Sequence, residues 1–98
     1  MASVSRTGRP WARTVARVLR RDHGICHLCG RPDADTADHL VPYSLGGPPY
    51  DLANLAAAHH KVWPHCNRVR GNRPIEQARA EIAELIERSS TTNSSWSW

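Results

Sequence analysis

Two cysteines spaced as C-x-x-C, Cys26 and Cys29 in GICHLCG, restrict the fold of this chain more than any other feature. A chain of 98 residues holds one domain at most, with a thin hydrophobic core, and such chains often need a metal, a disulfide or a partner for stability. The chain has 3 cysteines, an odd number that cannot all pair internally. The C-x-x-C pair therefore indicates half of a metal site or a redox pair, and a redox pair needs a βαβ context that the sequence does not show.

A tetrahedral zinc site needs two ligands besides such a pair. Cys66 is the obvious third ligand. Three nearby histidines, His59, His60 and His65, are the candidates for the fourth. His65 is the weakest of them, because it adjoins Cys66 and neighbouring residues chelate one ion poorly.

Positive charge is in excess and unevenly distributed, with a formal net charge of +4 and a pI near 9.5. Residues 1–21 contain arginines and no acid, and a second basic group surrounds Cys66. Planar guanidinium groups suit bidentate contacts with phosphate, and clustered positive charge attracts polyanions. The residues predicted to bind nucleic acid are Arg13, Arg17, Arg20, Lys61, Arg68 and Arg70.

Membrane insertion and secretion are not expected. No apolar run approaches the roughly 20 residues that a membrane-spanning helix needs. The basic N-terminus lacks the apolar segment of a secretion signal. We therefore expect a cytoplasmic protein in a reducing compartment.

Hydrophobic patterning predicts the main elements. Apolar residues between Pro10 and Arg21 recur at helical spacing, with arginines on the other faces, which predicts a basic amphipathic helix. TADHLVPY, residues 36–43, reads as a short strand that Pro42 ends or confines to an edge. LAAAH, residues 55–59, fits a short strand or the start of a helix, and we favour the strand.

Two helices are expected in the C-terminal part. PHCNRVRGN resembles the first turns of a helix that Gly71 stops, and a final helix opens with Pro74 in its first turn. This organisation predicts one domain over residues 9–88, between a disordered N-terminus (1–8) and a disordered tail (89–98). The tail is of low complexity, and its residues Trp96 and Trp98 have no assigned role.

Taken in order, the motifs resemble those of HNH endonucleases, and most closely the small zinc-containing HNH proteins of bacteriophages and prophages. The shared elements are C-x-x-C, Asp38-His39 in an apolar strand, a Gly-Gly loop, Asn54-Leu55, and Cys66-Asn67 followed by basic residues. The resemblance runs from about Trp11 to Pro74. It implies an α+β fold, a small ββα-metal domain with a zinc knuckle, flanked by an N-terminal basic helix and a C-terminal helix.

The resemblance also implies residue roles. His39 corresponds to the general base that activates water, and Asp38 to the first ligand of a catalytic Mg²⁺ or Mn²⁺ ion. Asn54 corresponds to the residue that braces the long loop and orients the catalytic histidine. Asn67 corresponds to the last residue of the motif, Asn here rather than His, and would complete the catalytic metal site. Because adjacent strand residues point to opposite faces, Asp38 and His39 converge only where the strand ends, twists or bulges.

The sequence departs from the family at the second knuckle. The family carries C-x-x-C-N or H-x-x-C-N there, whereas Trp63 stands at the expected ligand position. Counting forward from Asn54 places the ligand at His59, before a short insertion within HKVWPH. This ranks His59 first, His60 second and His65 last. His27 is expected to point outward, and His23 to lie on the surface.

The function implied is a metal-dependent DNA endonuclease, with nicking as one mode, carrying structural zinc and a catalytic Mg²⁺ or Mn²⁺. The alternative is a non-catalytic zinc-containing module, on the same scaffold, for nucleic-acid binding or assembly. The partners expected are DNA and a phage packaging or restriction assembly, with the chain a monomer or weak dimer. The resemblance also implies a phage or prophage protein in a bacterial host.

Overall fold

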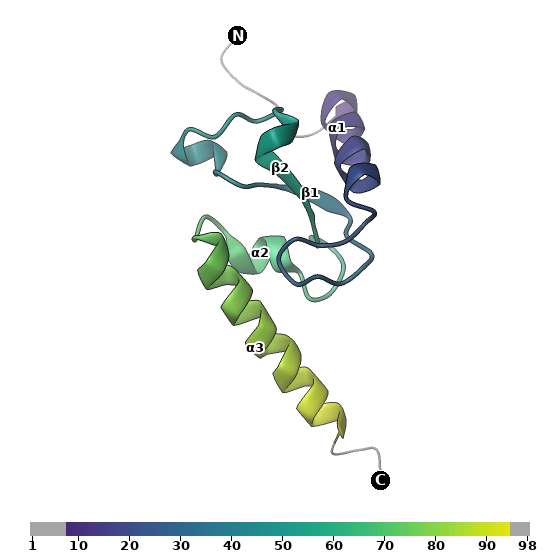
Figure 1. Ribbon diagram of the computed structural model, residues 1–98, viewed down its shortest axis with the longest axis vertical. Coiled ribbons are helices and arrows are strands. Elements are labelled where there is room, and N and C mark those ends of the chain that lie inside the picture. Colours follow the sequence, from purple (N-terminus) through teal and green to yellow (C-terminus); the bar gives the residue numbers. More distant parts are fainter. Residues whose placement is uncertain (1–7, 95–98) are drawn as a thin grey trace.

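The computed structural model describes residues 8–94. Along the chain these form α1 (Gly8–Arg21), β1 (Thr36–His39), the 3-10 turns η1 (Tyr43–Leu45) and η2 (Leu52–Asn54), β2 (Leu55–Ala58), α2 (Cys66–Arg70) and α3 (Ile75–Ser94). Figure 1 shows the two strands in the middle, α1 beside them, and α3 extending away from them. The predicted α+β class, two strands followed by a helix, is confirmed.

The sheet consists of β1 and β2 paired antiparallel, with Asp38 opposite Ala56 and His39 opposite Leu55. The strand predicted over residues 36–43 ends earlier, at His39. Beyond that point the backbone amide and carbonyl of Val41 bond to the side chain of Asn54 instead of to a strand. The side chain of Asn54 thus replaces a neighbouring strand as the hydrogen-bonding partner of Val41, and β1 ends before Pro42.

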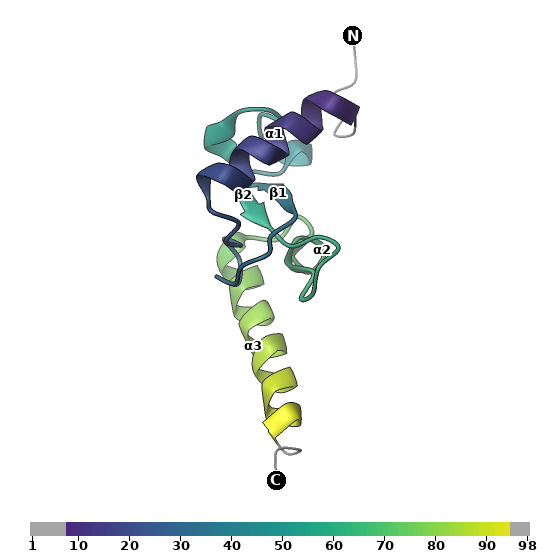
Figure 2. The same ribbon diagram turned by 90° about the vertical axis from the view of Figure 1, so that its right-hand side faces the viewer.

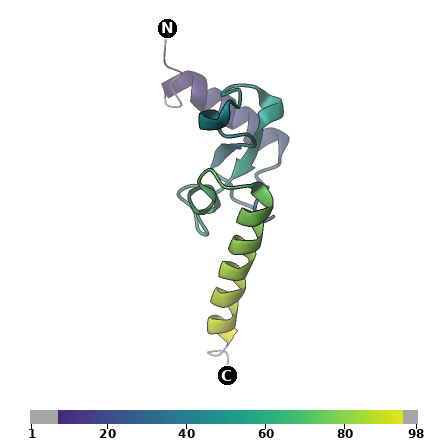
Figure 3. The same cartoon turned by 90° about the vertical axis from the view of Figure 1, so that its left-hand side faces the viewer.

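Helices cover both faces of this sheet. On one face Ala37, Leu55 and Ala57 pack against Val18 of α1. On the other face Ala58 packs in a cluster that joins the cysteines to α3. Figures 2 and 3 show α1 and α3 on opposite sides of the strands. A two-stranded sheet is marginal alone, and packing against helices supplies the burial that it needs.

The end of α1 is fastened to the outer edge of β2. Arg21 Nη2 donates to the carbonyl of Leu55 at 2.5 Å, and Asp22 Oδ2 accepts from the amide of Ala57 at 2.9 Å. The hydrogen bond from Arg21 lowers the pKa of Asp22, although burial opposes this. These contacts occupy backbone groups that a bare strand edge would expose.

Helix α3 begins as predicted but continues beyond the predicted boundary at residue 88, to Ser94. Ala78 and Ile82 are fully buried on its inner face. Its last residues are poor helix formers, but extending an existing helix is easier than nucleating one, so composition placed the helix end too early. The rest of the predicted tail, with Trp96 and Trp98, lies outside the described residues, as does most of the predicted N-terminal disordered segment. Across residues 8–94, each helix is too short or too polar to span a membrane.

Candidate functional site

Cys26, Cys29, His59 and Cys66 form a compact cluster whose candidate ligand atoms all lie within 4.8 Å of one another. His59 Nδ1 lies 3.4 Å from Cys29 Sγ and 3.7 Å from Cys66 Sγ. In a tetrahedral site with Zn–S of about 2.3 Å and Zn–N of about 2.05 Å, sulfur and nitrogen are about 3.6 Å apart. The cluster therefore has the donor types and the spacing that zinc requires.

Three elements bring these ligands together. The turn that carries Cys26 and Cys29 is closed by the amide of Gly30, which donates to the carbonyl of Cys26 at 2.8 Å. His59 follows β2, and Cys66 opens α2. His59 Nε2 donates to the carbonyl of Pro32 at 2.7 Å, so the proton is on Nε2 and the Nδ1 lone pair faces the sulfurs.

The thiols influence one another strongly. A hydrogen bond from the Cys66 thiol lowers the pKa of Cys26 to about 4, although burial opposes this. The same contact, with burial, raises the pKa of Cys66, and burial raises the pKa of Cys29. Without a cation the cluster thus favours a single thiolate. A divalent ion would neutralise further thiolates, which is the electrostatic role of structural zinc.

His59, ranked first as the fourth ligand, belongs to this cluster, and His60 and His65 lie outside it. The loop that follows His59 is held by Asp35, whose two carboxylate oxygens accept from the amides of His60 and Lys61 at 2.6 and 2.9 Å. Burial acts to raise the pKa of Asp35, but the hydrogen bonds from these amides together outweigh it and lower that pKa. The residues inserted after His59 therefore form a separate loop outside the cluster, and Asp35 holds that loop in place.

A cavity of about 370 Å³ lies beside the cluster, along the edge of β1 that faces away from β2. All four residues of β1 line it, although alternate residues point to opposite faces of the sheet. Asp38 and His39 therefore reach the cavity from the two faces, at the end of the strand. Asn67 of α2 and Trp11 of α1 line the same cavity.

The His39 ring is held in a single orientation. Its Nε2 lies 2.9 Å from the carbonyl oxygen of Pro49, and its plane stacks on Trp11 at 5.5 Å between centroids and 9° between planes. A carbonyl only accepts, so Nε2 carries the proton and Nδ1 carries the lone pair. His39 is thus fixed in the tautomer in which Nδ1 can accept a proton.

Asn54 braces the loop that presents the Pro49 carbonyl. Its side-chain amide accepts from the amide of Val41 at 2.9 Å and donates to the carbonyls of Val41 and Pro48 at 3.0 and 3.1 Å. Gly47 lies against this junction, where a Cβ would stand 1.8 Å from the Val41 oxygen. Only glycine fits there, so Gly47 and Asn54 together fix the loop that orients His39.

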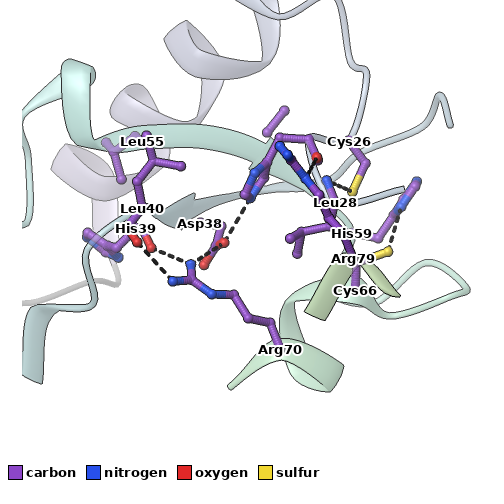
Figure 4. A network of polar contacts seen from close by, with 12 residues as sticks. Cys26, Leu28, Asp38, His39, Leu40, Leu55, His59, Cys66, Arg70 and Arg79 are labelled. Carbon is purple, nitrogen blue, oxygen red and sulfur yellow. Dashed lines mark hydrogen bonds and ion pairs between the residues drawn. The ribbon is translucent and has the colours of Figure 1, made fainter. Parts of the chain in front are cut away.

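Arg70 was predicted to bind DNA, and the structure contradicts this. Its side chain is buried beside the strand, where Nη1 lies 2.7 Å from Asp38 Oδ2 and 2.6 Å from the carbonyl of His39. Nη2 donates to the carbonyl of Leu40 and Nε to that of Arg73, both at 2.8 Å. Figure 4 shows Arg70 reaching from α2 to Asp38 and the end of β1. Its spacing from the buried Cys66, one helical turn, was the available signal for an inward side chain.

His27 was expected to point outward, and this is also wrong. Its Nε2 lies 2.8 Å from Asp38 Oδ2, and its side chain is only 12% exposed. No sequence signal predicts this contact, because it depends on where β1 lies relative to the cysteine turn. His23 is exposed, as predicted.

The other residues predicted to bind nucleic acid are exposed: Arg13, Arg17, Arg20, Lys61 and Arg68. Arg13 and Arg17 line a second cavity, of about 560 Å³, with Tyr50. Trp11 packs edge-to-face on Tyr50, with 6.0 Å between ring centroids, and it also stacks on His39. One aromatic pair therefore connects the arginine-lined cavity to the cavity of Asp38 and His39.

Comparison with known proteins identifies the domain. No curated protein and no solved structure matches the chain significantly. The family model described as HNH endonuclease matches residues 26–73, a segment that holds the whole cysteine–histidine cluster. It also holds the cavity residues Asp38, His39 and Asn67, together with Asn54. Residues 26–73 therefore match the HNH endonuclease family.

Proposed function

We propose that this protein is a metal-dependent DNA endonuclease in which His39 is the general base. The observation that carries the proposal is the fixed His39 ring, whose Nε2 proton is held by the Pro49 carbonyl at 2.9 Å. That contact leaves Nδ1 to take a proton from the attacking water, beside the two residues expected to hold the catalytic ion. Stacking on Trp11 and the Asn54 brace keep the ring in place, so little orientational freedom has to be lost in the reaction.

Asp38 and Asn67 are proposed to hold the catalytic Mg²⁺ or Mn²⁺. Both line the cavity that His39 lines, and carboxylate and amide oxygens suit these hard ions. Mg²⁺ usually keeps several waters and takes one or two protein carboxylates plus substrate phosphate, so two protein ligands fit its needs. When bound, the ion would stabilise negative charge on the phosphate and on the leaving oxygen.

The cysteine–histidine cluster has a different proposed role. Four protein ligands complete a tetrahedral shell, which is typical of structural zinc and leaves no position for water or substrate. We therefore assign zinc to the stability of the knuckle, and the chemistry to the cavity beside it.

The substrate is proposed to lie across α1. Arg13 and Arg17 are exposed around the second cavity, and Trp11 connects this cavity to His39. Guanidinium groups there would bind phosphates on one side of the scissile bond, with Arg20, Lys61 and Arg68 as further contacts. Arg70 takes no part in DNA binding, because its guanidinium is used within the protein.

One observation favours the alternative, a non-catalytic zinc-containing module for nucleic-acid binding or assembly. Asp38 Oδ2 already accepts from Arg70 and His27, as a purely structural carboxylate would. In that case Asp38 would hold α2 and the knuckle together without binding an ion.

Cleavage of supercoiled plasmid by zinc-loaded protein decides between the two. Wild-type protein should cut with Mg²⁺ or Mn²⁺ and not without a divalent ion, and the ratio of nicked to linear product distinguishes nicking from double-strand cutting. His39→Ala should lower the rate by about two to four orders of magnitude, the usual worth of a positioned base. His23→Asn is the control, because it changes an exposed histidine at a positive φ of 56° that asparagine tolerates.

Zinc content and thermal melting identify any variant that has lost its fold. DNA binding without cutting by wild-type protein would support the alternative. Cutting by folded His39→Ala at the wild-type rate would refute the proposed mechanism.

A further inference from the structure

We propose that His27 is a positioning residue for Asp38, and that the zinc knuckle itself holds His27 in place. The inference rests on the proposed function in one respect, the assignment of Asp38 as a ligand of the catalytic ion. His27 lies between two proposed zinc ligands, Cys26 and Cys29, and the inference gives it a role at the proposed catalytic metal site.

The argument begins with the two oxygens of Asp38. Both polar contacts of its carboxylate, with His27 at 2.8 Å and with Arg70 at 2.7 Å, are made by Oδ2. In the described part of the chain Oδ1 has neither a hydrogen bond nor an ion pair, and Asp38 lines the cavity. Two donors on one oxygen restrain rotation of the carboxylate. The other oxygen is therefore presented for a ligand.

The two donors come from different parts of the fold, and each is itself held. The backbone amide of His27 donates to the carbonyl of Ala57 at 2.8 Å, and its carbonyl accepts from Arg79 Nε of α3 at 3.0 Å. Arg70 is fixed by the carbonyls at the end of β1. Neither side chain has to be ordered when an ion binds, which is the purpose of outer-sphere hydrogen bonds around a metal ligand.

The link to zinc follows from the position of His27 in the chain. It stands between Cys26 and Cys29, whose sulfurs belong to one cluster. Metal bound to both sulfurs would fix the backbone on each side of His27, and with it the direction of the ring. The two metal sites are therefore connected by one side chain and one hydrogen bond.

The test compares His27→Gln with His27→Leu in zinc-loaded protein. Both replacements keep a side chain of similar length, but only glutamine can donate to Asp38. Mn²⁺ binding, measured by electron paramagnetic resonance of the free ion, should be about 10-fold weaker in His27→Leu and within about threefold of wild type in His27→Gln. Cleavage rates at limiting Mn²⁺ should follow the same order, and His23→Asn should match wild type in both measurements.

Equal Mn²⁺ binding by folded, zinc-containing leucine, glutamine and wild-type proteins would overturn the inference. A second measurement needs no variant: in ¹⁵N spectra of the wild-type protein, the Nε2 proton of His27 should be protected from exchange by its bond to Asp38. A rapidly exchanging proton there would overturn the inference as well. If wild-type protein neither binds Mn²⁺ nor cuts DNA, the proposed function fails, whereas a protected His27 proton would still establish its hold on Asp38.

Discussion

Replacing both Arg13 and Arg17 with alanine should make DNA binding measurably less dependent on salt. The two side chains are exposed and line one cavity on α1. They are four positions apart in the sequence, which is about 6 Å along the helix axis at 1.5 Å per residue. Successive phosphates of one DNA strand advance by about 3.4 Å along the duplex axis, so the two guanidiniums can reach different phosphates. Each lost contact should reduce the slope of log K against log salt by about 0.9, and the pair by about 1.8.

Fluorescence anisotropy of a labelled duplex, titrated at several salt concentrations without divalent ions, measures this slope. Arg88→Ala is the charge control, because Arg88 is 74% exposed on the part of α3 that projects away from the strands (Figure 1). It should change the slope by much less than one unit. An unchanged slope in the double variant, or an equal reduction in Arg88→Ala, would show that DNA does not lie across α1.

Three further outcomes are expected. In Cys26→Ser the zinc content, measured by elemental analysis, should fall below about one ion per chain. Cooperative unfolding, followed by circular dichroism, should be abolished because zinc binding and folding are coupled. A folded variant with full zinc content would contradict this. Gly47→Ala should destabilise the protein by about 1–3 kcal/mol in chemical denaturation, because its Cβ collides with the Val41 carbonyl; wild-type stability would show that the loop is free to move. Asp35→Asn should destabilise by about 1–3 kcal/mol, since a charged acceptor of two backbone amides is lost. The pKa of Asp35 is lowered from 3.8, so this difference from wild type should be constant from about pH 7 to about pH 5 and disappear as the pH falls below 3.8; a difference already lost at pH 5 would refute the assignment.

The grouping of Cys26, Cys29, His59 and Cys66 could be predicted because the sequence signals for it are local. A C-x-x-C turn brings two sulfurs to one ion whatever the rest of the fold does, and only a few nearby histidines competed for the fourth position. The position of β2 could likewise be predicted from its composition, and the first turn of α3 could be predicted from Pro74. Asp38 and His39 could be paired with a cavity only through a resemblance, since alternation alone directs them to opposite faces.

The two wrong residue assignments share a physical cause. Arg70 was assigned to DNA from the charge of its neighbours, although it lies one helical turn after Cys66 in α2, on the same buried side of that helix. Its burial is tolerated because each of its three guanidinium nitrogens donates to an acceptor within the protein. His27, which lies between the two cysteines, was expected to point outward. Arg70 and His27 reach Asp38 from 32 and 11 residues away along the chain, so both contacts depend on how these segments pack in the fold.

The stacking of Trp11 on His39 determines where the chain can be divided or fused without separating parts of the proposed site. Trp11 lies upstream of the family segment at residues 26–73, and so does Val18, which covers one face of the sheet. A graft limited to residues 26–73 would carry every proposed metal ligand, yet its histidine would lack a stacking partner and Leu55 would be open to water. The portable unit of this protein therefore begins at α1. A fusion or domain exchange that keeps the junction before Gly8 preserves it, whereas a junction in the turn before Cys26 divides it.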